Sequence, residues 1–157
     1  MLTARLRGRC PSAMPVGRAF AHGHMLTFDK LGRDSSGKAT IKAASPEENI
    51  GGVLFHIRED DLAALDRAES GYIRQDSFFV LPAGRAVPLA AVTYIAPPEI
   101  CRNGLSPFDW YLELIRAGLR EHGFSQDYTE RLSHVQVIAD SDRDRSERMF
   151  GLCAMKS

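Results

Sequence analysis

The chain has 157 residues, of which 44% are hydrophobic and 25% are charged. This size and composition are typical of one globular domain with its own core, and they do not fit a disordered or fibrous chain. The 20 basic and 20 acidic residues give zero net charge, which argues against a nucleic-acid-binding protein that acts by neutralising phosphates.

The predicted elements, taken in chain order, mix strands and helices without a regular alternation. A short helix is expected over 2–9, strands over 13–21, 24–30, 38–44 and 50–57, a helix over 59–69, strands over 72–81 and 87–96, and helices over 106–123 and 125–135. Ser106 is the expected cap of the longest helix. This order indicates an α+β fold in which a small, curled, mixed or antiparallel sheet is flanked by helices.

The chain is expected to divide into one domain over 1–138 and a charged tail over 139–157. The tail could form a terminal helix that packs Met149, Phe150 and Leu152 against the domain. No apolar segment is long enough to span a membrane, and the basic N-terminus lacks the apolar stretch of a secretory signal. We therefore expect no membrane association.

Three cysteines, Cys10, Cys101 and Cys153, are widely spaced and include no Cys-x-x-Cys pair. This argues against a disulfide framework and favours a reducing, cytoplasmic location. Cys101 is a conceivable thiol nucleophile, but no histidine lies near it in the sequence. A loop cysteine is the simpler interpretation.

Two short segments imitate ligand sites. The segment "GRDSSGKAT" has the glycines and the lysine (Lys38) of a phosphate-binding loop, but Ala39 stands where Ser or Thr would hold magnesium, and a strand follows. A polar hairpin turn is favoured. His22 and His24 could face a metal together, but no third ligand has a suitable spacing, so "HGH" is interpreted as a turn and no metal is expected.

The side chains of Trp110 and Tyr111 point about 100 degrees apart on the predicted helix, so one of the two rings could border a cavity. Arg74 could meet a carboxylate of a ligand, although a solvated strand arginine is the simpler interpretation.

Glu69 lies near the end of the predicted helix over 59–69, where Ser70 and Gly71 terminate the helical pattern. A helix dipole favours bases at this end, so a carboxylate is out of place there. A solvated charge is one interpretation. The other is chemical, because a carboxylate that is half-buried at the mouth of a curled sheet has a raised pKa and can transfer protons near neutral pH.

Four segments together resemble the γ-glutamylcyclotransferase-like (AIG2-like) family. They are "ARLRGRCPSA", "FDKLGRDSSGKATI", "IGGVLFHIREDDLAALDRAESGY" and "FDWYLELIRAGLREHGFSQDYTERL", and they span most of residues 3–135. The third contains the family's Leu-Asp-x-x-Glu element at 65–69. The resemblance implies a small barrel-like sheet surrounded by helices, a cavity at one end, and no metal or cofactor.

The resemblance also implies an activity, in which the α-amine of a γ-glutamyl amino acid or amine attacks its own γ-carbonyl. The products are 5-oxoproline and a free amine, so a small γ-glutamyl compound is the expected ligand. The family's catalytic glutamate corresponds to Glu69, a general acid and base. Its two cavity tyrosines correspond to Tyr72 and Tyr111, and the segment from Glu69 to Tyr72 is shorter here than in the family.

The family's first strand ends in Tyr-Gly-Ser-Asn-Met, whose backbone amides hold the substrate, whereas this sequence starts at the last residue of that motif. Met1 and Leu2 are therefore the residues expected to reach the substrate from this side. Without the motif, the alternative is a non-catalytic module that binds a small molecule or a partner; another lyase or transferase on the same fold also remains open. An unpaired sheet edge would favour a homodimer.

Overall fold

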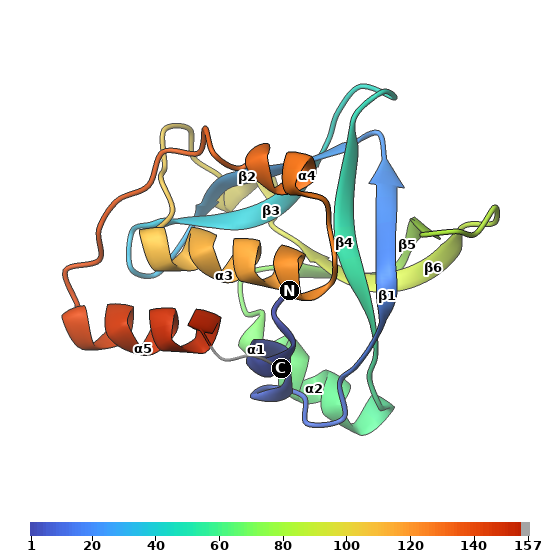
Figure 1. Cartoon of the computed structure of the whole chain (residues 1–157), viewed down its shortest axis with the longest axis horizontal. Helices are drawn as coiled ribbons and strands as arrows, with labels where there is room; N and C mark the ends of the chain where they lie inside the picture. Colours follow the sequence, from blue (N-terminus) through green and yellow to red (C-terminus); the bar gives the residue numbers. More distant parts are fainter. Residues whose placement is uncertain (155–157) are drawn as a thin grey trace.

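The computed structural model describes residues 1–154 and confirms the predicted α+β order (Figure 1). The strands are β1 (Met14–His22), β2 (His24–Leu31), β3 (Gly37–Ala43), β4 (Asn49–His56), β5 (Ile73–Pro82) and β6 (Leu89–Ile95). The helices are α1 (Thr3–Arg7), α2 (Glu59–Ala68), α3 (Asp109–Glu121), α4 (Gln126–Glu130) and α5 (Arg143–Ala154), with a 3-10 turn at Pro98–Ile100.

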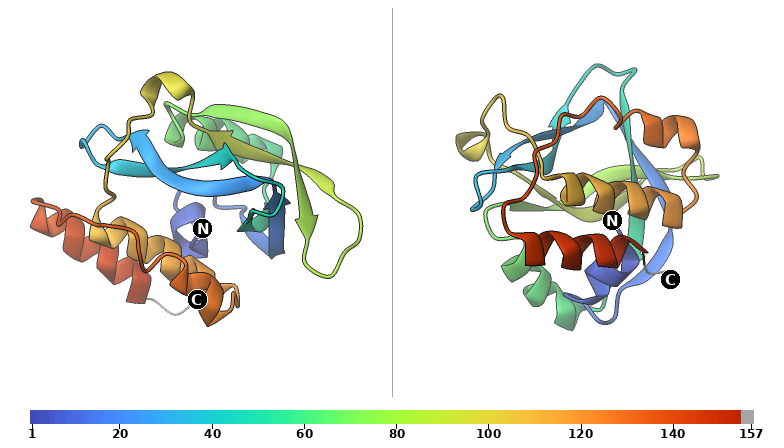
Figure 2. Two further views of the ribbon diagram at one scale, coloured as in Figure 1. Left: turned by 90° about the horizontal axis from the view of Figure 1, so that it is seen from above. Right: turned by 60° about the vertical axis from the view of Figure 1, so that its left-hand side comes forward.

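The strands form a curled, antiparallel arrangement rather than a closed barrel. Four of them make one sheet in the order β4-β1-β5-β6, and β2 and β3 form a separate hairpin. β1 pairs with β4 over its whole length but with β5 only at Ala19 and Phe20, so the two halves of the larger sheet splay apart. Figure 2 shows α3 and α5 side by side on one side of the strands.

Two apolar clusters hold these layers together. The helical cluster contains Leu2, Phe108, Trp110, Leu114 and Ala117, and the cluster around α1 and α2 contains Leu6, Cys10, Ala13 and Leu65. Met149 and Leu152 of α5 pack on the helical cluster as the sequence predicted, whereas Phe150 is exposed. Among the described residues, no helix has both the length and the apolar character needed to cross a bilayer.

The start of α3 and the length of α4 differ from the prediction. Phe108, not Ser106, is the N-cap of α3. The backbone of Ile138 donates to Pro107 O at 3.0 Å and accepts from Asp109 N at 3.0 Å, which holds the segment before α3 extended. α4 is shorter than predicted because the chain after Glu130 continues as turns.

Candidate functional site

Glu69 caps the C-terminus of α2, where its N–H donates to Leu65 O at 2.8 Å. Gly71 then adopts a φ of +89°, a value that glycine tolerates best, and reverses the chain. The N–H of Tyr72 donates to Glu69 O at 3.0 Å and closes this turn before β5 begins. The helix therefore ends at the residues that the sequence indicated, and the Glu69 side chain lies at a helix–strand junction.

The carboxylate of Glu69 forms an ion pair with Arg9, which follows α1. Arg9 Nη1 donates to Glu69 Oε1, and the two side chains are 28% and 17% exposed. Within residues 1–154, Oε2 accepts no hydrogen bond. One carboxylate oxygen is thus anchored and the other can exchange a proton. Sequence reasoning missed Arg9, because the two residues are 60 positions apart and no local pattern connects them.

Tyr72 and Tyr111 meet at the backbone of one residue of β3, Ala39. The Tyr72 hydroxyl donates to Ala39 O at 2.9 Å, and Ala39 N–H donates to the Tyr111 hydroxyl at 3.2 Å. The pairing of β2 with β3 is irregular between Thr27 and Lys30, so Ala39 takes its partners from side chains instead of from a strand. The fold therefore brings together the two tyrosines that the sequence selected.

Burial raises the pKa of both phenols, and for Tyr72 the neighbouring Tyr111 and Glu69 add to that rise. Both hydroxyls consequently stay protonated at neutral pH. They can donate or accept hydrogen bonds beside Glu69, but they cannot act as phenolate bases.

The first two residues are anchored on α3. The side chain of Leu2 is buried in the helical cluster. The backbone of Met1 lies so close to Gly118 that an added Cβ there would be 2.8 Å from Met1 C. Burial lowers the pKa of the Met1 amino group, and Glu121 partly opposes this. Contact of Met1 or Leu2 with a substrate stays a prediction.

Three cations near the turn at 69–72 have no acidic partner within residues 1–154. Arg5 Nη1 donates to Met149 Sδ at 3.5 Å, and Arg33 Nη2 donates to Ser70 Oγ at 3.3 Å. The third is Lys30 of β2, which is only 8% exposed. Its pKa is lowered first by burial and then by the charges of neighbouring basic residues. With Arg9 included, basic groups outnumber acids around Glu69.

The segments that imitate ligand sites are turns, as the sequence favoured. "GRDSSGKAT" connects β2 to β3, and Asp34 accepts hydrogen bonds from Ser36 Oγ at 2.7 Å and from Lys38 Nζ at 2.9 Å. His22 and His24 flank Gly23, whose φ of +67° makes the turn between β1 and β2. Within residues 1–154, no three His, Cys, Asp or Glu side chains gather in a group that could hold a metal ion.

The other candidate residues have structural partners. Arg74 pairs with Asp66 and Asp76 at 2.8 Å each, so it is a surface strand arginine. Cys101 lies after the 3-10 turn and directs its thiol to Pro97 O at 3.6 Å, and burial raises its pKa, which disfavours the nucleophilic thiolate.

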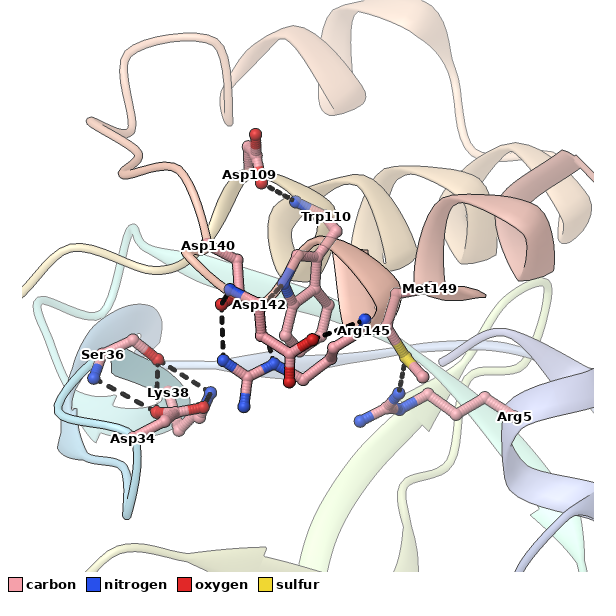
Figure 3. A network of polar contacts seen from close by, with 10 residues as sticks. All are labelled: Arg5, Asp34, Ser36, Lys38, Asp109, Trp110, Asp140, Asp142, Arg145 and Met149. Atoms are coloured by element: carbon pink, nitrogen blue, oxygen red, sulfur yellow. Dashed lines mark hydrogen bonds and ion pairs between the residues drawn. The ribbon is translucent and has the colours of Figure 1, made fainter. Parts of the chain in front are cut away.

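Trp110 belongs to a paired polar network between α3 and α5 (Figure 3). Its indole Nε1 donates to Asp140 at 2.8 Å, and Arg145 donates two further hydrogen bonds to the same carboxylate. The Asp140 side chain is 0% exposed. The hydrogen bonds from Arg145 are the largest influence on the pKa of Asp140 and hold it well below its usual range. Burial acts in the opposite direction but is weaker.

Two cavities lie elsewhere in the fold. One of about 130 Å³ lies within the curled sheet and is lined by β1, β4, β5 and β6 residues, together with Ile41 of β3. The other, of about 280 Å³, lies between β2, β4, α3 and α4. The linings of both include Ile50 and Gly51, and neither includes Glu69, Tyr72 or Tyr111. Tyr128 occupies one backbone donor of β4 beside these cavities, because its hydroxyl accepts a hydrogen bond from Gly51 N–H.

Comparison with known proteins gives matches for the fold but not for the sequence. Neither a protein-family model nor a curated protein matches the sequence. The solved structure of the human protein loc79017 matches with a TM-score of 0.77 and 22% identity over 93% of this chain and 92% of that chain.

A structure named γ-glutamyl cyclotransferase matches with the same TM-score of 0.77 and 22% identity over 94% of this chain and 92% of that chain. YkqA from Bacillus subtilis matches with a TM-score of 0.69 and 22% identity over 86% of this chain and 49% of that longer chain. Likeness at this level of identity establishes the architecture. The chain therefore has the γ-glutamylcyclotransferase-like fold that the resemblance implied.

Proposed function

We propose that this chain is a γ-glutamylcyclotransferase-like enzyme, which converts a γ-glutamyl amino acid or amine to 5-oxoproline and a free amine. The observation that carries the proposal is the placement of Glu69. It is a single carboxylate at a helix–strand junction, with one oxygen anchored by Arg9 and the other open. Tyr72 and Tyr111, on both of which the Glu69 charge acts, supply protonated hydroxyls.

The reaction requires proton transfer at two nitrogens, and Glu69 can serve both. The α-ammonium of the substrate gives a proton to Oε2, and the free amine attacks the γ-carbonyl carbon. A five-membered ring closes through a tetrahedral intermediate, and Glu69 then protonates the leaving nitrogen as the C–N bond breaks. The two protons that the α-nitrogen loses end on the released amine, so the balance needs no co-reactant.

The ion pair with Arg9 gives this step its geometry. A carboxylate held through one oxygen keeps a fixed orientation, so its second oxygen can be positioned for both proton transfers. Because the attacking amine and the carbonyl belong to one molecule, the site has mainly to fold the substrate and move protons. We infer that the reaction takes place in the cytoplasm, where the three free cysteines would stay reduced. The homodimer stays a prediction.

The test is release of 5-oxoproline from a panel of γ-glutamyl amino acids and amines by the wild type and by Glu69→Gln. The variant should lose at least about 10²-fold to 10⁴-fold in kcat, the range typical of a lost general acid and base. Its melting temperature should stay close to that of the wild type, since the pair with Arg9 is partly exposed.

Glu59→Gln is the matched control, because it makes the same change at the exposed opposite end of α2. It should keep full activity. A Glu69→Gln protein that melts several degrees lower would assign Glu69 a structural role instead. Absence of release by the wild type from every substrate would contradict the enzyme proposal and favour the non-catalytic binding module.

A further inference from the structure

Lys30 is a charged side chain that the fold buries without a direct ion pair among residues 1–154, although the charges of Glu69 and Asp34 act on it. The residue is 8% exposed, and within residues 1–154 its ammonium makes no ion pair or hydrogen bond with a carboxylate. The ammonium lies over the ring of Tyr72, whose centroid is 4.9 Å from Nζ. A cation–π contact offsets only part of the cost of removing an ammonium from water.

The other lysines of the same hairpin are neutralised. Lys38 Nζ lies 2.9 Å from Asp34 Oδ2, and Lys42 forms an ion pair with Asp29. The hairpin thus provides a direct ion pair for each of its two more exposed lysines, whereas the most buried one, Lys30, is influenced by the charge of Asp34 without forming an ion pair with it. Such an arrangement is unfavourable for the free protein, and it is what a site for an anion requires.

The ammonium of Lys30 lies close to Gly71, in the turn that follows Glu69. A Cβ added to Gly71 would be 3.6 Å from Nζ, and Gly71 and Ser70 are both exposed. The charge of Glu69 acts on Lys30 and opposes the lowering of its pKa. A ligand that reaches Oε2 of Glu69 therefore lies within reach of Lys30.

We propose that Lys30 is a substrate-binding residue whose ammonium forms an ion pair with a carboxylate of the γ-glutamyl substrate. This inference rests on the proposed function for the identity of the substrate, but not for the anion site itself. Every γ-glutamyl amino acid carries two carboxylates, one on the glutamyl α-carbon and one on the leaving amino acid. The excess of Arg5, Arg9, Lys30 and Arg33 over Glu69 suits a ligand with net negative charge.

The first test measures binding and does not depend on turnover. Glutarate is the probe, and its uncharged diamide at equal concentration is the control, both at matched ionic strength. Glutarate should raise the melting temperature of the wild type and of Lys42→Met, and it should leave that of Lys30→Met unchanged. Without ligand, Lys30→Met should melt higher than the wild type, because a buried charge has been removed and the apolar stem is kept.

Three outcomes of this test would overturn the proposal. They are the absence of any glutarate effect on the wild type, an equal effect on Lys30→Met, and a lower melting temperature of unliganded Lys30→Met. The last would identify Lys30 as a structural residue held by Tyr72. If the wild type shows no turnover but glutarate binding requires Lys30, the proposed function fails while the anion site stands.

The second test uses turnover to identify the carboxylate. KM should rise at least about tenfold in Lys30→Met with kcat nearly unchanged, as expected for a lost binding contact. A rise for γ-glutamyl amino acids but not for γ-glutamyl alkylamines assigns the contact to the leaving group. If KM rises for both substrate classes, and the rise disappears for analogues with an α-carboxamide, the contact is with the α-carboxylate. A fall in kcat with KM unchanged would contradict a carboxylate-binding role.

Discussion

Two clusters of charged residues in this molecule are built on opposite principles. Around Asp140, one buried carboxylate receives hydrogen bonds from Trp110, Arg145 and the backbone of Asp142. Around Glu69, basic groups are in excess, and among residues 1–154 one carboxylate oxygen accepts no hydrogen bond and the buried Lys30 has no direct ion pair. The first cluster is complete without a ligand and the second is not.

The difference separates structural charges from functional ones. A saturated ion pair at the junction of α3 and α5 fixes the position of one helix on the other. An unsaturated group of charges is kept at a cost to stability, which is common at sites that bind charged ligands. Changes to the Asp140 cluster should therefore act on stability, and changes to the Glu69 cluster should act on binding and turnover.

The largest stability effect should come from Asp140→Ala. The substitution leaves the indole N–H of Trp110 and the Arg145 guanidinium without their partner, and we expect a loss of about 3 kcal/mol in the free energy of unfolding. Urea unfolding monitored by Trp110 fluorescence measures it. A loss below about 0.5 kcal/mol, which is ordinary for a surface substitution, would show that the two clusters do not differ as described.

The pH dependence of stability should distinguish the clusters next. Because the folded-state pKa of Asp140 lies below its unfolded-state value, its contribution is complete above about pH 5 and is lost as the pH falls toward the folded-state pKa. Asp140→Asn should therefore lose less stability than the wild type between about pH 5 and pH 2. Equal losses on acidification in chemical unfolding experiments would mean that Asp140 is not the titrating group.

Tyr72→Phe and Tyr111→Phe should have smaller effects on stability. Each removes one hydrogen bond to the backbone of Ala39, which typically changes stability by about 1 kcal/mol. Both variants should also lose activity, because these hydroxyls belong to the two tyrosines on which the Glu69 charge acts. Thermal unfolding and 5-oxoproline release measured on the same samples would check this. Activity unchanged in both would restrict the tyrosines to a structural role.

Arg74→Met should have the smallest effect. Its pairs with Asp66 and Asp76 are exposed, and exposed ion pairs contribute little. Neither the melting temperature nor the turnover should change measurably. A loss of turnover would extend the functional cluster onto β5 and weaken the contrast between the two regions.

Local patterns in the sequence predicted most of the fold, because hydrophobic periodicity and turn residues act over a few positions. The α2 end at Glu69 and the β2–β3 turn are examples. The start of α3 was predicted wrongly because Ile138, which is distant in sequence, holds Pro107 and Asp109. The burial of Lys30 and the ion pair of Arg9 with Glu69 could not be predicted from the sequence either, because both arise from contacts between distant segments.

The most direct test of the central claim is the mass of the product formed from a γ-glutamyl amino acid in H₂¹⁸O. Cyclisation through Glu69 uses no water, so the wild type should release 5-oxoproline without ¹⁸O, and Glu69→Gln should release none. Glutamate carrying ¹⁸O would mean that the site hydrolyses its substrate. That result would contradict the proposed role of Glu69 in intramolecular proton transfer.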